Sequence, residues 1–323
     1  MEEEIITQTA QTVRTLRPND ADFPYLLRQL PLSPSEQVKE LFIRGDLLSC
    51  DKDTPYRFLC VVGSRKHTSY GERACQSLIE GLRGYNICIV SGLAIGIDAI
   101  AHEAALRVGL PTIAFPGSGL DRKVLYPARN QHLGERIANT PHCALVSEFN
   151  NDFTATDWSF PRRNRLMAGI SHATLVIEAK LDSGTLITSR LAGDYNRDVL
   201  AVPGPIFSSL SEGPNMLISK GAAIIRSSED IIAALGLSPE DRSVTSLSDG
   251  GDTRGGHDAS DSLSQQEINI LDLLIEPMDK EYLIDKIIQQ HHLSIAEINA
   301  HLSMLELSGY IIESGGMIEP GHT

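Results

Sequence analysis

The sequence predicts an α/β protein with an extended, Rossmann-like, doubly wound and mostly parallel sheet, followed by a small C-terminal winged-helix-like domain. Between residues 55 and 235, seven short apolar runs alternate with helical patterns. The runs do not alternate apolar with polar residues, which is typical of a parallel sheet covered on both faces. After residue 263, three helical patterns and a short hairpin predict the winged helix.

Length and composition limit the class of protein. A chain of 323 residues is expected to form roughly two domains. No apolar run approaches the ~20 residues that span a membrane, and the acidic start Met1–Glu4 lacks the features of a signal peptide. We therefore expect a cytoplasmic protein without membrane contact. Five scattered cysteines with no CxxC pair indicate buried thiols rather than a metal site or disulfides.

The chain divides into four segments. Residues 1–54 form a short N-terminal lead-in, with a weak helical pattern over residues 1–16. Residues 55–236 form the Rossmann-like domain, residues 237–262 form a flexible linker rich in Ser, Asp and Gly, and residues 263–323 form the winged-helix-like domain.

The net charge of −14 is distributed unevenly. Residues 55–235 hold 18 Lys and Arg against 16 Asp and Glu, so a local basic groove is compatible with an acidic chain. Residues 263–323 hold 2 against 10. Phosphate contacts need cations, so we expect the winged helix to contact protein rather than DNA.

The Rossmann-like domain is expected to alternate strands with helices. The predicted strands are 58–62, 87–90, 112–115, 144–147, 174–178, 199–202 and 223–225. The predicted helices are 70–83, 96–108, 129–138, 163–170, 184–195, 213–219 and 228–235.

The ends of these strands carry residues suited to anions. The first strand ends at Gly63, Ser64, Arg65 and Lys66, which can cradle a phosphate or form a plain turn with solvated charges. The second ends at Ser91–Asp98, which is not GxGxxG and lacks the later acidic residue of a dinucleotide site. There we expect Asp98 and His102 to hydrogen-bond each other in a structural role.

Three later segments extend this pattern. The Gly117–Asn130 loop allows close backbone approach by a ligand, or is only a loop. Arg162, Arg163 and Arg165, with Asn164, open a helix, where cations oppose the macrodipole. This local cost suggests that they face an anion, and a solvated turn is the alternative. Ser183, Gly184 and Thr185 offer another helix terminus, or serve only as caps.

Several exits with glycine or hydroxyl groups, and arginines at more than one, suit a run of phosphates better than a single small ligand. A single-stranded nucleic acid would fit, and its binding would be salt-sensitive and sequence-tolerant. No catalytic residue, metal ligand or cofactor site is predicted. The candidate residues for binding such a strand are Gly63, Ser64, Arg65, Lys66, Gly117, Arg129, Asn130, Arg162, Arg163, Asn164, Arg165, Ser183, Gly184 and Thr185.

The ordered motifs VGSR, SGLAIGIDAIAHEAAL, GSGLDRKVLYPARN, SEF, FPRRNRLMAGIS, VIEAKLDSGTLITSRLA, RDVLAVPG and EGPNMLISKGA resemble the DprA/Smf family of bacterial DNA-processing proteins. The resemblance implies a homodimeric, non-enzymatic protein that binds single-stranded DNA and delivers it to the RecA recombinase during natural transformation. It also places the DNA pocket on Gly63–Arg65, Gly117–Asn130 and Arg162–Arg165. The short lead-in departs from family members with an N-terminal SAM-like module.

An enzyme or sensor for a nucleotide-derived ligand is the alternative. The fold implied by the resemblance is similar to that of the nucleotide phosphoribohydrolases that activate cytokinins, which carry PGGxGTxxE. Here Pro116–Asp121 matches that signature only in part, and Ser183-Gly184-Thr185 lacks a Glu three residues later. The catalytic carboxylate is therefore not in place.

Overall fold

The computed structural model describes residues 13–33, 36–242, 270–271, 273–274, 278–291, 295–307, 310–314 and 317–320. The chain divides into two compact units, Met1–Leu247 and Ser248–Thr323. Most of the predicted linker, from residue 243, and most of the first predicted helix of the winged helix lie outside the described residues, as do residues 1–12. Within the described parts, no helix is long and apolar enough to cross a membrane.

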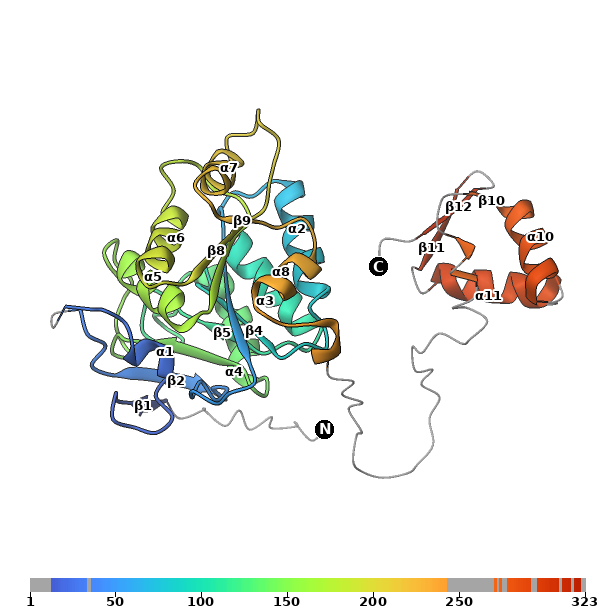
Figure 1. The fold of residues 1–323 in the computed structure, drawn as a ribbon. Helices are drawn as coiled ribbons and strands as arrows, with labels where there is room; N and C mark the ends of the chain where they lie inside the picture. The colour runs from blue at the N-terminus through green and yellow to red at the C-terminus, as the bar shows by residue number, and fades with distance from the viewer. Residues whose placement is uncertain are drawn as a thin grey trace, which may run out of the picture. The chain divides into compact units, whose positions relative to one another are not determined.

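The first unit is built on a nine-stranded sheet in the order β1-β2-β6-β5-β4-β3-β7-β8-β9 (Figure 1). The strands from β3 to β9 are parallel, and all seven predicted strands are confirmed. The seven are β3 (Arg57–Val62), β4 (Ile87–Ser91), β5 (Thr112–Ala114), β6 (Ala144–Ser147), β7 (Ala173–Val176), β8 (Asp198–Ala201) and β9 (Ala223–Ile224).

The lead-in supplies two further strands that the sequence patterns do not predict. β2 (Leu41–Gly45) pairs antiparallel with β6, and β1 (Arg14–Leu16) pairs antiparallel with β2. The last residues of the weak helical pattern over 1–16 are therefore a strand. The sheet is mostly parallel, with an antiparallel edge.

Helices cover both faces of the sheet, as in a doubly wound fold (Figure 1). The helices are α1 (Tyr25–Arg28), α2 (Ser69–Glu80), α3 (Ile97–Arg107), α4 (Gln131–Asn139), α5 (Ser159–Ile170), α6 (Thr185–Asp194), α7 (Glu212–Ser219) and α8 (Ser228–Ala234), with 3-10 turns at Ala128–Asn130 and Pro239–Asp241.

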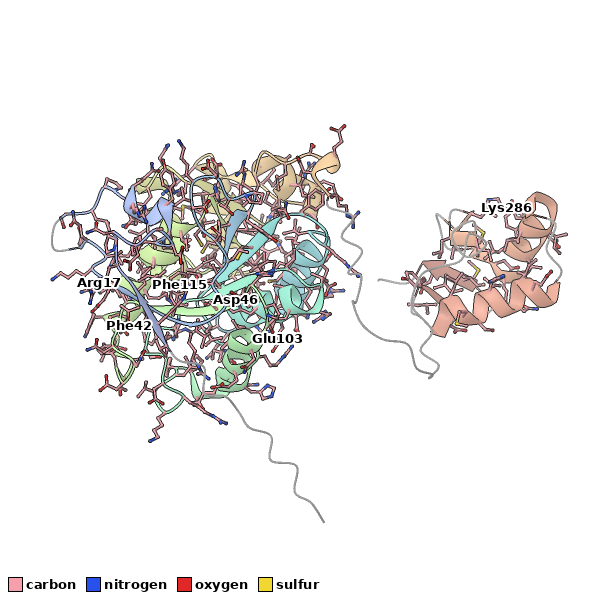
Figure 2. All side chains as sticks on the ribbon, turned by 90° about the horizontal axis from the view of Figure 1, so that it is seen from below. Arg17, Phe42, Asp46, Glu103, Phe115 and Lys286 are labelled. Atoms are coloured by element: carbon pink, nitrogen blue, oxygen red, sulfur yellow. The ribbon has the colours of Figure 1, made fainter. Side chains whose placement is uncertain are left out.

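Alternate residues of one strand enter two different cores. Leu59 and Val61 of β3 pack with α2, α3 and α8, whereas Phe58, Cys60 and Val62 pack with α5 and the lead-in. Both sets are buried, which explains why the strand reads as a continuous apolar run. Figure 2 shows the side chains of both faces, including buried Phe115. All five cysteines are buried and free, as predicted.

The chain order across the sheet creates one topological switch point. From β3 the chain adds β4, β5 and β6 on one side, and then crosses to place β7, β8 and β9 on the other. The loops after β3 and β7 therefore leave neighbouring strands and connect in opposite directions. Ligands of open α/β sheets bind at such a crevice, outside the carboxyl ends of the strands.

The second unit is a winged helix in its described part. It contains α10 (Lys280–His291), α11 (Ile295–Leu307) and a three-stranded sheet in the order β10-β12-β11. The strands are β10 (Met278–Asp279), β11 (Ile311–Ser314) and β12 (Met317–Pro320). Its core holds buried side chains from both helices and the sheet, among them Leu283, Leu302 and Ile318.

Candidate anion-binding site

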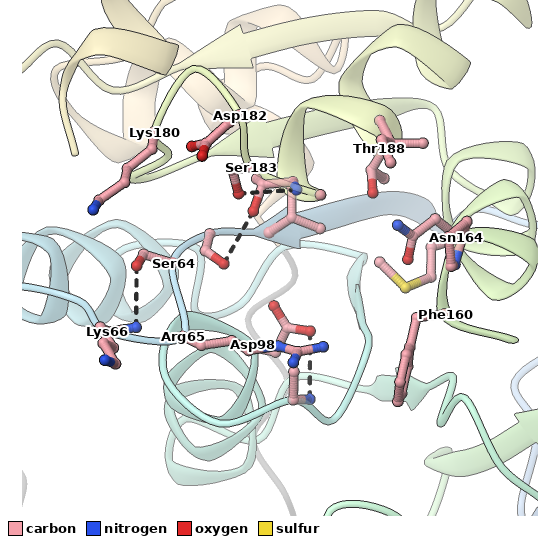
Figure 3. A pocket seen from close by; sticks show the side chains of 18 of the residues that line it. Ser64, Arg65, Lys66, Asp98, Phe160, Asn164, Lys180, Asp182, Ser183 and Thr188 are labelled. Atoms are coloured by element: carbon pink, nitrogen blue, oxygen red, sulfur yellow. Dashed lines mark hydrogen bonds between the residues drawn. The ribbon is translucent and has the colours of Figure 1, made fainter. Parts of the chain in front are cut away.

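A pocket of 720 Å³ opens at the switch point (Figure 3). The loops after β3 and β7 line it, together with the first turns of α5 and α6. Further lining residues are Ala94 and Asp98 around the start of α3, and Ser209 and Leu210 before α7. Its volume falls in the range of small-molecule and cofactor sites. Residues that the sequence singled out at two strand exits, after β3 and after β7, line this cavity.

The loop after β3 packs against the backbone of the loop between β4 and α3. Ile97 N donates to Ser64 O at 3.2 Å. Gly96 has φ of 85°, and a Cβ there would overlap Ser64 O and lie 2.8 Å from Arg65 Cα. A Cβ at Gly63 would lie 2.6 Å from Ile97. Glycine at these two positions lets the loops stack, so the second exit is the scaffold on which Arg65 rests.

The loop after β7 closes against the loop after β3. Ser183 Oγ accepts from Thr185 N at 3.1 Å, and Thr185 Oγ1 donates to Gly63 O at 3.2 Å. Ser64 Oγ accepts from Lys66 N at 3.0 Å in a similar turn (Figure 3). The predicted residues Gly63–Lys66 and Ser183–Thr185, 120 positions apart, thus meet at one edge. Helix α6 begins here, and its free N–H groups favour an anion.

Cations and one aromatic ring face this cavity. Arg65, Lys66 and Lys180 line it and are exposed. The Arg65 Cζ atom lies 5.3 Å from the centroid of the Phe160 ring, a cation–π contact (Figure 3). Sequence reasoning missed Lys180, although its place just after β7 was a usable signal.

Arg163 also lines the pocket, but the residue is only 5% exposed and its guanidinium is hydrogen-bonded to the protein backbone. Its Nη1 donates to the carbonyls of Gly92 and Phe115, which join the exits of β4 and β5. Its Nε has no partner among the described residues. Burial lowers the pKa of Arg163, and the nearby Asp98 carboxylate opposes that effect.

Asp98 completes this buried arrangement. Its Oδ2 accepts from Gly92 N at 3.2 Å and from Ala94 N at 3.4 Å. Burial raises the pKa of Asp98, against the charge of Arg163. The predicted hydrogen bond between Asp98 and His102 is wrong. His102 Nδ1 instead pairs with Thr112 Oγ1 at 2.7 Å, because the α3 side chain faces β5. Burial lowers the pKa of His102 to about 3, so its predicted structural role holds.

Five predicted residues lie outside the pocket lining, namely Gly117, Arg129, Asn130, Arg162 and Arg165. Gly117 instead supports Phe160, since a Cβ there would lie 2.7 Å from the ring Cε1. Asn130 is buried and donates from Nδ2 to Leu93 O at 2.8 Å. Arg129 is exposed in the 3-10 turn before α4.

Arg162 and Arg165 share one carboxylate. Arg162 Nε lies 2.7 Å from Glu148 Oε1, and Arg165 pairs with Glu148 Oε2. The Arg165 and Glu148 side chains are 8% and 4% exposed, whereas that of Arg162 is 46% exposed. Residues 162 and 165 are three apart and so share one face of α5, whereas Arg163 points about 100° away from Arg162. The dense run of arginines therefore divides between two surroundings.

Fold and site together define a class: a doubly wound, Rossmann-like protein with a cationic pocket at its switch point, followed by a winged helix. The family described as DNA recombination-mediator protein A matches residues 14–236. The DprA winged helix domain matches residues 257–317. The chain belongs to the DprA/Smf family of DNA-processing proteins, which confirms the resemblance and the predicted fold class.

Two curated relatives show how far the similarity extends. Protein Smf of Escherichia coli is 40% identical over 222 residues, covering 68% of this chain and 56% of that protein. The match thus spans little more than half of that relative. Protein Smf of Synechocystis is 33% identical over 322 residues, covering 94% of this chain and 78% of that protein.

Two solved structures share the fold. DNA processing protein A from Streptococcus pneumoniae has a TM-score of 0.60 and 36% identity, covering 69% of this chain and 74% of that one. The protein of the same name from Helicobacter pylori has a TM-score of 0.59 and 30% identity, covering 70% and 96%. That Helicobacter structure is described as giving insight into a single-stranded DNA binding mode.

Proposed function

We propose that this protein binds single-stranded DNA at the switch-point pocket and acts without catalysis. The observation that carries the proposal is the meeting of two strand-exit loops, Gly63–Lys66 and Lys180–Thr185, whose exposed cations line one cavity. The single-stranded DNA binding mode described for the Helicobacter relative supports the same ligand.

Each part of the pocket has a role in this proposal. Arg65, Lys66 and Lys180 neutralise phosphates, and the N–H groups at the start of α6 donate hydrogen bonds to a phosphate oxygen. Phe160, already against Arg65, offers a face on which an unpaired base stacks. Binding that depends on phosphates and stacking is salt-sensitive and tolerant of sequence.

The biological role follows from family membership. We propose a cytoplasmic homodimer that protects incoming DNA and loads the RecA recombinase during natural transformation or recombination. The winged helix contacts protein in this proposal. Its α11 has Glu297 and Glu306 but no Lys or Arg, so it lacks the cations that DNA contact requires.

A nucleotide-processing enzyme is the second candidate, because a 720 Å³ cavity also suits a nucleotide. The residue at the position of the signature's catalytic Glu is Thr188, which has no carboxylate. The Asp98 carboxylate in the pocket already accepts hydrogen bonds from two backbone N–H groups, which argues against a catalytic role. Incubation with nucleoside monophosphates should release no free base. Release at enzymatic rates would favour the enzyme.

The proposed function is tested by reversing charge in the pocket. Arg65→Glu combined with Lys66→Glu should weaken binding to a fluorescent oligo-dT by at least tenfold and lower the slope of log K against log salt by about 2. Arg83→Glu, an exposed arginine outside the pocket lining, is the matched control. Equal affinities for the two variants would refute the proposal.

A further inference from the structure

The loop between β8 and α7, residues 202–211, exposes two large apolar side chains. Phe207 is 97% exposed and Ile206 is 80% exposed, the two highest values among the large hydrophobic residues that the structure describes. Leu181 and Ile187, in and beyond the loop after β7, are 57% and 42% exposed. These four residues form what we call the apolar rim. Uncovered apolar side chains forfeit the stabilisation of burial, so the rim needs a ligand or partner to explain it.

The stem of this loop is held firmly. Tyr70 OH donates to Pro203 O at 2.6 Å, and Ala179 N donates to Leu210 O at 2.7 Å. The Asn215 side chain accepts from Gly204 N at 3.3 Å and donates to Gly204 O at 3.1 Å. The tip is therefore presented from a fixed base, and its exposure is not the result of a loosely attached segment.

Part of the apolar rim lies at the pocket, and the rest is close to lining residues in the chain. Strands β7 and β8 are parallel neighbours, so the loops that follow them leave from the same edge of the sheet. Ile187 itself lines the pocket, as do Ser209 and Leu210, which lie just beyond Phe207 in the chain. Leu181 lies between two lining residues. Arg65 and Lys66 line the same pocket and lie across it from Lys180 and Asp182 (Figure 3).

A single DNA strand has the same division of chemistry. Its phosphates are anionic, and its bases are flat and apolar on both faces. We propose that the apolar rim binds unpaired bases of the strand whose phosphates contact Arg65 and Lys66, with Phe207 as the stacking residue. This inference rests on the proposed function and adds the base-contacting surface to it. A duplex keeps its bases stacked inside, so the rim selects single strands.

The test uses the full chain and two probes of equal length and charge: oligo-dT, and an abasic oligonucleotide with the same phosphates and no bases. Wild-type protein should bind oligo-dT more tightly than the abasic probe. Phe207→Ser should lose about fivefold or more of the oligo-dT affinity, the effect of one stacked base, and keep its abasic affinity. Tyr282→Ser, which removes a 62% exposed aromatic from the second unit, should match wild type on both probes.

The outcomes separate this inference from the proposed function. Unchanged oligo-dT affinity in Phe207→Ser would overturn the base-contacting role, and so would an equal loss on both probes. A change of oligomeric state in light scattering, without a change in the preference for oligo-dT, would identify the rim as a contact between copies and also overturn it. If Arg65→Glu with Lys66→Glu binds both probes as wild type does, the proposed function itself fails, whatever Phe207→Ser does.

Discussion

Replacing Gly96 with Ala should displace the loop that carries Arg65. Gly96 has φ of 85° and ψ of −136°, a region that is essentially restricted to glycine. The added Cβ would overlap Ser64 O and lie 2.8 and 2.9 Å from Arg65 Cα and C. All three neighbours are backbone atoms, so no side-chain rotation relieves the contact. The loop after β3 must move by about 1 Å to reach the usual C···O separation of about 3.3 Å or more.

Two costs add in this variant. The unfavourable backbone conformation costs about 1–3 kcal/mol, and overpacking costs about 1–3 kcal/mol more. Gly109 provides the matched control, because it also has a positive φ, of 74°, but an added Cβ there meets nothing within 4 Å. Gly109→Ala should therefore cost only about 1–2 kcal/mol. Gly96→Ala should also weaken oligo-dT binding, whereas Gly109→Ala should not.

Urea unfolding followed by tryptophan fluorescence measures the difference. The chain has one tryptophan, Trp158, which packs edge-on to Phe149 and Phe153 with centroids 5.6 Å apart. The signal therefore reports on the first unit alone. Equal losses of unfolding free energy in the two variants, with equal oligo-dT affinity, would refute the conclusion that the position of the Arg65 loop requires glycine at residue 96.

Two further predictions concern buried charge. Arg165→Ala leaves Glu148 buried with a weaker partner and should cost about 3 kcal/mol or more. Arg162→Ala removes a half-exposed partner and leaves Glu148 paired with Arg165, so it should cost less than about 1 kcal/mol. Similar costs for the two variants in urea unfolding would contradict this. Burial lowers the pKa of folded His102 to about 3. Below about pH 6.5 the unfolded chain therefore binds a proton at this histidine that the folded chain does not bind. The free energy of unfolding then decreases by up to about 1.4 kcal/mol for each pH unit by which the pH is lowered. His102→Gln should reduce this dependence between pH 7 and pH 5, and an unchanged dependence would count against the buried neutral imidazole.

The parallel part of the sheet was predictable because its strands are buried on both faces. Leu59 and Val61 pack on one side of β3 and Phe58 and Cys60 on the other, and this leaves an apolar run in the sequence. The two antiparallel edge strands leave no such run. β1 has three residues with one buried, and β2 is only partly buried. The strand conformation of β2 depends on pairing with β6, a contact about 100 residues away that no local pattern encodes, and β1 in turn pairs with β2.

The site was predictable to the extent that topology determines it. Glycine, hydroxyl and basic residues marked both Gly63–Lys66 and Ser183–Thr185 as candidate strand exits, and the topology brings the two segments together. The surroundings of each arginine were not predictable. Helix α5 is packed on more than one side, so Arg163 points to the exits of β4 and β5 while Arg165 meets Glu148. A count of positive charges in FPRRNR cannot distinguish these two environments, because each depends on partners supplied by distant parts of the chain.

The contrast between Arg163 and Arg65 predicts which charges would attract an anion to the pocket. A buried cation exerts a weakly screened field, but the charge of Arg163 is opposed by Asp98, which lies beside it under the same loops. An anion in the cavity therefore gains little from that pair. Its attraction comes from exposed Arg65, Lys66 and Lys180, whose counterions it displaces. Affinity should thus depend steeply on salt, even though the chain as a whole carries a net charge of −14.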